Sequence, residues 1–333
     1  MYGEASRIEG NLSPSETTAP LLGRRGETAV EIARLDGRTV VVTGAAGGIG
    51  FFVAEGLARL GARVVVAARS AARAHSAIGL LPEPGLHRHL PLDLSDRESI
   101  LSAGDALRRL GTLDGIVLNA GIIAAPRTAA TGAFGVESTV GVNVLAHLEL
   151  LRSALPALEE APAARIVSTG SMLTRRIPFD PDDWLSQKSY RPRVAYAMSK
   201  HAAEILGFEL DRRLLDAGSR IRSVVAHPGG AIDALTPERP PLHERPLPVR
   251  LLAPALAPLV SRLVQGKDSA ARPAVAAVAA PTLPRNAYIG PRHGAAGEPV
   301  LATPVPSSTD AALGARLWHE AEAILGGPVL GAL

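Results

Sequence analysis

Apolar runs and helix-like stretches alternate along the chain from residue 38 onward, and this alternation predicts the fold. Residues 39–42 form a β-branched apolar run, and residues 51–60 repeat apolar side chains at helical spacing. Further strand-like runs lie at 63–68, 86–92, 115–118, 164–167, 221–225 and 287–289, with helix-like stretches between most of them. Continuous apolar strands separated by helices are typical of parallel sheets with both faces covered. The pattern therefore predicts an α/β fold: a doubly wound, mainly parallel sheet with helices on both faces, in a single domain.

Two segments depart from this alternation. Residues 1–36 are rich in Ser, Thr, Pro and Gly and predict a flexible N-terminal arm, which leaves 37–333 as the folded domain. Residues 230–265 contain five prolines between 237 and 248 and an amphipathic stretch from 251 onward. We interpret 230–265 as a lid over a ligand site, with a plain surface loop as the alternative.

Composition narrows the possible classes of protein. The 333 residues include 47% apolar residues, enough for a core, and 35 Lys plus Arg against 32 Asp plus Glu. Because no run of basic residues exceeds two, we expect neither nucleic-acid binding nor a polybasic membrane anchor. No apolar stretch is long enough to span a bilayer, and the first residues lack a signal-peptide pattern. The chain has no cysteine and nine histidines without metal-ligand spacing, so we expect no disulfide, no metal site and a cytoplasmic location.

A glycine-rich turn joins the first predicted strand to the first predicted helix. Its sequence at 43–50 is Thr-Gly-Ala-Ala-Gly-Gly-Ile-Gly. Glycine lets the backbone turn tightly and approach a pyrophosphate, and a helix N-terminus offers free N–H groups to an anion. In this position the turn predicts a Rossmann-type dinucleotide site, with a plain tight turn as the alternative. The candidate contacts are Gly44, Ala46, Gly48, Ile49 and Gly50.

The end of the second predicted strand indicates which dinucleotide the site would take. An acidic residue there would bind the ribose 2′-hydroxyl of NAD, whereas an arginine accommodates the 2′-phosphate of NADP. Here the acid is absent; Arg69 stands in its place and Arg73 follows one helical turn later. Because the guanidinium fork suits phosphate, we expect NADP(H), with a solvated surface arginine as the alternative.

Tyr196 and Lys200 form the most informative pair in the chain, since it has only four tyrosines. On a helix, positions i and i+4 share a face, so the ammonium can lie near the phenol. A nearby cation favours phenolate, so we expect Lys200 to lower the pKa of Tyr196 and make it a proton donor and acceptor. The alternative is an ordinary amphipathic helix with a core tyrosine and a surface lysine.

Together these motifs resemble the short-chain dehydrogenase/reductase family, in its non-extended branch, over roughly residues 36–325. The glycine-rich turn and the Tyr196–Lys200 pair match that family's motifs. The resemblance implies four catalytic residues: Asn143, Ser171, Tyr196 and Lys200. It also implies cofactor contacts from the Asp-Leu, Asn-Ala-Gly and Pro-Gly motifs and from the catalytic pair: Asp93, Leu94, Asn119, Ala120, Gly121, Tyr196, Lys200, Pro228 and Gly229.

Two features place the chain within the family. Ser171 and Tyr196 are 25 residues apart, a long separation that resembles the retinol dehydrogenase and protochlorophyllide reductase group. The protochlorophyllide branch relies on a cysteine, which this chain lacks. Where the family usually has a threonine near the nicotinamide, this chain has Asp233, so that contact is weaker or Asp233 faces solvent. Arg191 and Arg193 favour an acidic substrate or are simply solvated.

The resemblance implies a function. We expect an NADP(H)-dependent oxidoreductase that transfers a hydride between the nicotinamide and a carbonyl or secondary alcohol. The substrate would be a small molecule, and the apolar, proline-rich lid favours a lipophilic one. Association into a homodimer or homotetramer through the helices of Asn143 and Tyr196 is also expected. The alternative is a non-catalytic NADP-binding sensor or scaffold of the same fold.

Overall fold

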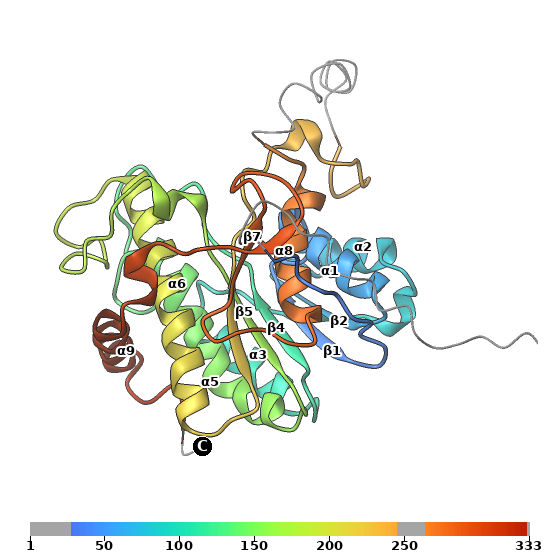
Figure 1. The fold of residues 1–333 in the computed structure, drawn as a ribbon, viewed down its shortest axis with the longest axis horizontal. Coiled ribbons are helices and arrows are strands. Elements are labelled where there is room, and N and C mark those ends of the chain that lie inside the picture. The colour runs from blue at the N-terminus through green and yellow to red at the C-terminus, as the bar shows by residue number, and fades with distance from the viewer. Residues whose placement is uncertain (1–27, 245–263, 332–333) are drawn as a thin grey trace, which may run out of the picture.

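The protein is built around one eight-stranded sheet, in the strand order β3-β2-β1-β4-β5-β6-β7-β8 (Figure 1). The computed structural model describes residues 28–244 and 264–331. The first seven strands run parallel, and β8 pairs antiparallel with β7 at the edge. The strands are β1 (Thr39–Thr43), β2 (Arg63–Ala68), β3 (Arg88–Pro91), β4 (Gly115–Leu118), β5 (Arg165–Thr169), β6 (Arg222–Ala226), β7 (Tyr288–Pro291) and β8 (Pro299–Leu301).

Alternate residues of each strand enter different cores, which explains the continuous apolar runs. In β1, Val40 and Val42 pack beneath one helical layer and Val41 beneath the other, and all three are fully buried. One layer consists of α1 (Gly48–Arg59), α2 (Ala71–Leu80) and α8 (Lys267–Ala279). The opposite layer consists of α3 (Arg97–Arg108), α5 (Ala146–Glu159) and α6 (Pro192–Asp216) (Figure 1). The predicted fold class, a doubly wound Rossmann-type sheet in a single domain, is confirmed.

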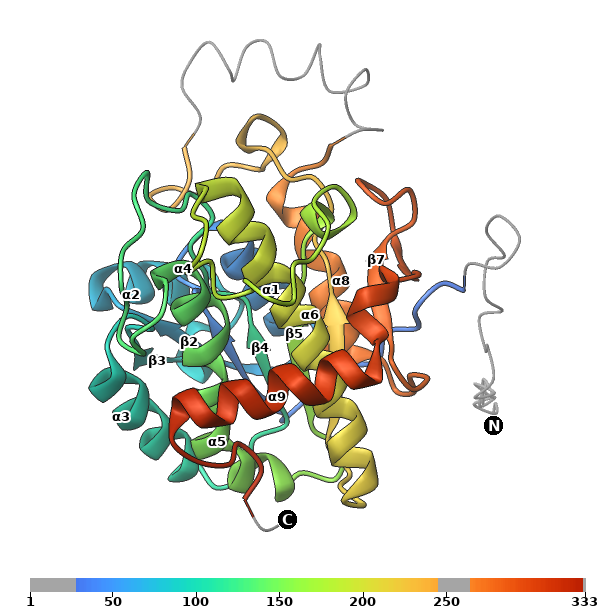
Figure 2. The same ribbon diagram turned by 90° about the vertical axis from the view of Figure 1, so that its left-hand side faces the viewer.

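A further helix, α9 (Ala311–Leu325), packs on the outer side of α6 and crosses in front of α5 and α6 (Figure 2). Its Trp318 is buried, with the Arg213 guanidinium 5.0 Å from the ring centroid. A 3-10 turn, Pro306–Thr309, leads into α9 and also lies against α6. Among the helices of residues 28–244 and 264–331, none combines the length and apolar character needed to cross a membrane.

The segments that departed from the alternation are only partly covered by the structure. Of the predicted flexible arm, residues 1–27 lie outside the described residues, whereas 28–36 are bound to the sheet. Leu301 N–H donates to the Thr28 carbonyl at 3.1 Å, and Leu35 is buried. Of the predicted lid, residues 245–263 also lie outside the described part. Its base is closed by a pair of backbone hydrogen bonds in which Gln265 bonds with Gly230 and Ile232.

Candidate active site

The glycine-rich turn lies between β1 and α1, at the carboxyl edge of the sheet. Gly44 and Gly48 have φ values of +71° and +57°, in the left-handed region that favours glycine. At Gly50, a Cβ would lie 2.5 Å from both the Gly44 carbonyl oxygen and the Asn119 Nδ2. Only glycine therefore permits this packing, and the turn presents its backbone at the N-terminus of α1, where an anion is stabilised.

Thr43, at the end of β1, connects this turn to the end of β4. Its Oγ1 accepts hydrogen bonds from the backbone N–H groups of Asn119 and Ala120, both at 2.9 Å. In return, Asn119 Nδ2 donates to the Thr43 carbonyl at 2.9 Å. The first predicted motif and the Asn-Ala-Gly motif therefore form one unit at adjacent strand ends.

Arg69 and Arg73 follow β2 in the chain, and Arg73 lies beside the glycine-rich turn. Arg69 is exposed directly after β2, and Ser70 caps α2 by accepting the Arg73 backbone N–H at 3.3 Å. The Arg73 guanidinium reaches back over the turn, so that a Cβ on Gly47 would lie 2.9 Å from Arg73 Nη2. Two guanidinium groups and no carboxylate therefore follow β2 in the chain, an arrangement that suits a phosphate.

Further candidate cofactor contacts follow β3 and β6. Asp93 Oδ1 accepts hydrogen bonds from the Ser95 N–H at 2.9 Å and the Ser95 hydroxyl at 2.6 Å. The Leu94 side chain is buried in the core, so only its backbone is available to a ligand. Gly229, with φ +72°, follows Pro228 after β6, and a Cβ there would lie 2.4 Å from the Ala295 carbonyl oxygen.

The predicted catalytic pair lies on one face of α6, with Ser171 directly after the neighbouring strand β5. Lys200 Nζ donates to the Thr169 carbonyl at 2.9 Å and lies 6.0 Å from the centroid of the Tyr196 ring. Burial lowers the pKa of Lys200 to about 8, against the opposing attraction of the Glu204 charge. Lys200 is therefore poised to lose or keep its proton near neutral pH.

The predicted direction of the Tyr196 pKa shift is wrong. Burial raises the pKa of Tyr196, and a hydrogen bond with the Ser171 side chain opposes that shift without reversing it. The cause is the desolvation of the phenol, which the Lys200 ammonium, directed to the Thr169 carbonyl, does not offset. In the protein alone, Tyr196 is therefore a neutral phenol that can donate a proton.

Asn143 lies in a π-helical turn, Gly141–Leu145, between the short α4 (Ser138–Val140) and α5. Its Oδ1 accepts the Ile122 N–H at 2.7 Å, and its Nδ2 donates to the Ser199 hydroxyl at 2.9 Å. Ser199 in turn donates to the Tyr196 carbonyl at 2.8 Å. The amide of Asn143 therefore links the loop after β4 to the catalytic helix. Such π-turns are frequent at functional sites.

His147, one helical turn after Asn143, also belongs to this site. Its Nε2 lies 3.1 Å from Thr43 Oγ1 and its Nδ1 lies 3.3 Å from the Asn143 carbonyl oxygen. Burial, helped by the Lys200 charge, lowers the pKa of His147 to about 4, against the opposing hydrogen bond with the Asn143 carbonyl. Since a carbonyl can only accept, the neutral ring carries its proton on Nδ1 and accepts from Thr43 through Nε2. His147 thus connects the glycine-rich turn to Asn143.

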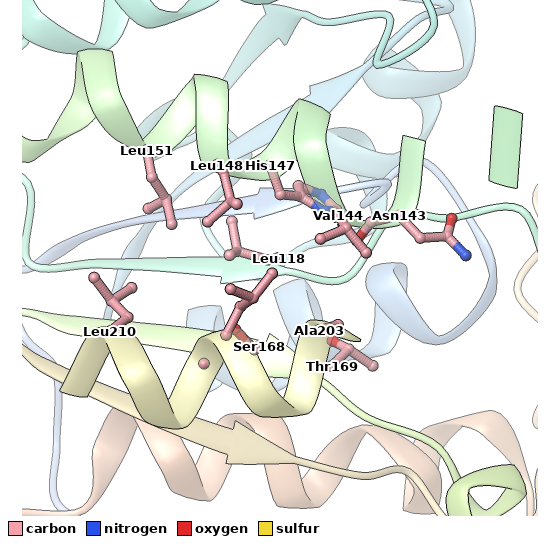
Figure 3. A pocket seen from close by; sticks show the side chains of 12 residues that line it. Leu118, Asn143, Val144, His147, Leu148, Leu151, Ser168, Thr169, Ala203 and Leu210 are labelled. Atoms are coloured by element: carbon pink, nitrogen blue, oxygen red, sulfur yellow. Dashed lines mark hydrogen bonds between the residues drawn. The ribbon is translucent and has the colours of Figure 1, made fainter. Parts of the chain in front are cut away.

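A cavity of about 30 Å³ lies beside His147, between α5, α6 and the ends of β4 and β5 (Figure 3). Its apolar end is lined by Leu151 and Leu210, and its polar end by Asn143 and Thr169. A volume of this size suits about one water molecule. The cavity is therefore an internal feature of the catalytic helices and is too small for an organic substrate.

The departure at Asp233 is resolved by an ion pair. The Asp233 carboxylate contacts the Lys267 ammonium in the first turn of α8, and His243 Nδ1 lies 3.7 Å from Asp233 Oδ1. Its side chain is 64% exposed, so the carboxylate is both paired and solvated. Arg191 and Arg193, whose role the sequence left open, are exposed at the start of α6.

The long segment between Ser171 and Tyr196 packs against two distant parts of the chain. Buried Trp184 donates from Nε1 to the Glu320 carboxylate on α9 at 2.7 Å. The Tyr190 hydroxyl donates to the Pro126 carbonyl at 2.6 Å, which ties the segment to the loop after β4. This insertion therefore connects the loop after β4 to α9.

Comparisons with known proteins agree with this geometry. The model of the short chain dehydrogenase family matches residues 38–239. Over 201 residues the chain is 36% identical to a polyprenol dehydrogenase of Mus musculus, covering 58% of this chain and 59% of that protein. Over 212 residues it is 34% identical to retinol dehydrogenase 14 of Homo sapiens, covering 59% of this chain and 62% of that protein. The matched part thus spans less than two thirds of either relative.

Solved structures extend the likeness to most of the chain. A crystal structure of an uncharacterised protein from Mycobacterium paratuberculosis has a TM-score of 0.70 at 30% identity, covering 90% of this chain and 98% of that one. A short chain dehydrogenase from Burkholderia cenocepacia J2315 in complex with NADP has a TM-score of 0.54 at 27% identity, covering 74% of this chain and 92% of that one.

Proposed function

The chain belongs to the short-chain dehydrogenase family, in the group that resembles retinol dehydrogenases, and we propose that it is an NADP(H)-dependent oxidoreductase acting on a lipophilic carbonyl or secondary alcohol. The observation that carries this proposal is the grouping of three side chains at the carboxyl end of β5. Tyr196 and Lys200 share one face of α6, and Ser171 hydrogen-bonds with Tyr196 from the end of β5. A proton donor and a second hydrogen-bonding group thus converge at the carboxyl edge of the sheet, where ligands bind in this fold.

Bound NADP(H) would supply the hydride, and the protein's own residues would bind, orient and transfer the proton. In the direction of carbonyl reduction, the neutral Tyr196 phenol donates its proton to the substrate oxygen. Ser171 hydrogen-bonds the same oxygen and holds it against the phenol. Lys200 binds the ribose of the cofactor and supplies positive charge that favours the phenolate left behind. Asn143 donates to the Ser199 hydroxyl and so holds α6 in position relative to α5. Its amide would also take part in a proton relay from the site to solvent.

The preference for NADP(H) rests on Arg69 and Arg73. Both guanidinium groups follow β2, and Arg73 extends over Gly47 at the turn that would hold the pyrophosphate. A 2′-phosphate could form bidentate, charge-assisted hydrogen bonds with either side chain. The NADP complex among the similar structures supports this choice.

The proposed substrate class rests on the loop after β4, to which Tyr190 of the insertion is hydrogen-bonded. Ile123, in that loop, is 75% exposed, the highest value among the large apolar residues in the described part of the chain. An exposed isoleucine beside the site suits an apolar ligand. The curated relatives are named for retinol and polyprenol, which are both lipophilic alcohols.

We also propose a cellular location and an oligomeric state. The absence of cysteine fits a reducing compartment, so we propose that the protein is cytoplasmic. Association through α5 and α6 would have to accommodate α9, which packs on the outer side of α6 (Figure 2). A homodimer that includes α9 in its interface is the form we favour.

The test is turnover of NADPH, followed at its absorbance band, with a panel of ketones and aldehydes from short polar to long apolar chains. We expect oxidation of NADPH with the apolar members and little with NADH under the same conditions. The alternative function, a sensor or scaffold, predicts NADPH binding with no turnover on any member of the panel in either direction. That result would refute the enzymatic proposal.

A further inference from the structure

Glu204 is a fully buried acid on the catalytic helix that the proposed mechanism does not use. It lies one helical turn after Lys200 and two turns after Tyr196, so the three residues follow one face of α6. Its carboxylate reaches the end of β5, where it accepts the backbone N–H of Ser171. A buried carboxylate is costly unless hydrogen bonds compensate for its lost hydration, so its surroundings reveal what it is for.

The carboxylate accepts hydrogen bonds from three separate elements. Oε1 accepts the backbone N–H of Ser171 at 3.2 Å and the Tyr288 hydroxyl of β7 at 3.4 Å. Oε2 accepts the Ser308 hydroxyl, from the turn before α9, at 2.8 Å. The Thr174 hydroxyl is 3.4 Å from Oε1 but gives its one proton to the Ser171 carbonyl, at 2.7 Å. The ionised Glu204 carboxylate therefore holds the backbone N–H of Ser171 in place.

Gly170 makes this contact possible. A Cβ at position 170 would lie 2.4 Å from Glu204 Oε1 and 3.1 Å from its carboxyl carbon. The φ of Gly170 is not in the left-handed region, so its backbone conformation does not require glycine. Space for the carboxylate is thus the local reason for a glycine directly before the catalytic serine.

Hydrogen bonds, and not an ion pair, compensate for this buried charge. Among the residues that the structure describes, the Glu204 charge acts on Lys200 of the same helix and on Tyr288 of β7, and Tyr288 in turn interacts with Arg175 and stacks on His227. The turn before α9 contributes only hydroxyl groups at this point. Burial raises the pKa of Glu204 to about 7, against the hydrogen bonds from the Ser308 hydroxyl, the Ser171 N–H and the Tyr288 hydroxyl, which lower it. Its charge in turn raises the pKa of Lys200.

We propose that Glu204 is a positioning residue for the reaction, whose ionised carboxylate holds the backbone of Ser171 and keeps Lys200 protonated. The inference rests on the proposed function, because Ser171 and Lys200 are its targets. When Glu204 gains a proton, Ser171 loses a charged acceptor and Lys200 loses its nearest negative charge. Turnover should therefore fall as pH decreases through the pKa of Glu204. The affinity for NADPH should change little, because Lys200, which would bind the ribose, has a pKa of about 8 and stays protonated on the acid side.

The test compares Glu204→Gln with the wild type by recording kcat and KM from pH 5.5 to 9. Glutamine keeps the shape and one acceptor but cannot ionise. We expect kcat at pH 8 to fall about 3–10-fold, the worth of one ordinary hydrogen bond. The acid limb near the pKa of about 7 should disappear, the alkaline limb should move to lower pH, and the KM for NADPH should stay within about twofold.

Ser308→Ala provides a second variant far from the substrate. Removing that donor disfavours the charged carboxylate and raises the pKa of Glu204. The acid limb of the pH profile should therefore move to higher pH in Ser308→Ala, whereas it should disappear in Glu204→Gln. If both profiles superimpose on the wild type after scaling, Glu204 is merely structural and the inference is wrong. If the wild type itself has no turnover with any ketone, the proposed function fails. The two failures are therefore distinguishable.

Discussion

The replacement of Gly50 by alanine tests whether the glycine-rich turn is close-packed against β4, as the structure requires. A Cβ at this position would lie 2.5 Å from the Gly44 carbonyl oxygen and from Asn119 Nδ2. Neither atom can move freely, because Gly44 is backbone and Asn119 Nδ2 donates to the Thr43 carbonyl at 2.9 Å. The turn or the asparagine must therefore shift.

The expected loss of stability follows from three effects. Overpacking of a close-packed site costs about 1–3 kcal/mol. Loss of the hydrogen bond between Asn119 and Thr43 costs about 1 kcal/mol more. Alanine recovers at most about 1 kcal/mol over glycine within a helix. Gly50→Ala should therefore lower the free energy of unfolding by about 1–3 kcal/mol and weaken NADPH binding at least about tenfold, since a tenfold change in affinity corresponds to about 1.4 kcal/mol.

Urea unfolding followed by circular dichroism measures the first quantity, and NADPH fluorescence titration measures the second. Gly79→Ala is the matched control, because Gly79 also lies in a helix and a Cβ there has no neighbour within 4 Å. The control should be as stable as the wild type or up to about 1 kcal/mol more stable, with unchanged NADPH affinity. If Gly50→Ala behaves like this control, the close approach of the turn to β4 is wrong.

Three further predictions concern the candidate site. Tyr196→Phe should bind NADPH normally but lose about 10²–10⁴-fold in kcat, because only the transferable proton is removed; Tyr190→Phe, which removes a phenol from the insertion, should stay near the wild type. Arg69→Ala should weaken NADPH by about 10–100-fold and NADH hardly at all, since a charged hydrogen bond to phosphate contributes about 1.5–3 kcal/mol; equal losses in titrations with the two cofactors would contradict the assignment. His147 has a folded pKa lowered to about 4, below its ordinary value, so its contribution to stability is present above the unfolded pKa and is lost as pH falls toward 4. The stability advantage of the wild type over His147→Gln in urea unfolding should therefore shrink between pH 6.5 and 4, and a constant difference would show that His147 is not held neutral.

The sequence predicted well those features that depend on local pattern. Seven strands were found, because residues buried on both faces leave continuous apolar runs. The missed strand, Pro299–Leu301, has three residues and exists only through its antiparallel pairing with β7. The pairing of Tyr196 with Lys200 was also predictable, since positions i and i+4 meet on any helix.

Features that depend on burial or distant contacts were not accessible in this way. The sign of the Tyr196 pKa shift was wrong because the sequence does not show how strongly the phenol is desolvated. His147 bonds with Thr43, and Glu204 with Ser308, across 104 residues in each case. Those contacts are fixed by strand order and by the docking of α9. The one signal in the sequence that could have identified Glu204 was its position, one helical turn after Lys200 on the same face of the predicted helix.

The contact between Ser308 and Glu204 has a consequence for the synthesis of the protein. Every proposed catalytic residue lies between positions 143 and 200, so the ribosome delivers all of them more than a hundred residues before Ser308. Until that residue emerges, the acid beneath Ser171 lacks its shortest hydrogen bond, and the apolar side of α6 that Trp318 covers is open to water. Chains fold from the N-terminus as they are made, so the sheet can form early while the site stays incomplete. A ribosome stalled before residue 308 would therefore hold a nascent chain that contains every proposed catalytic group but lacks both Ser308 and α9, which complete the site.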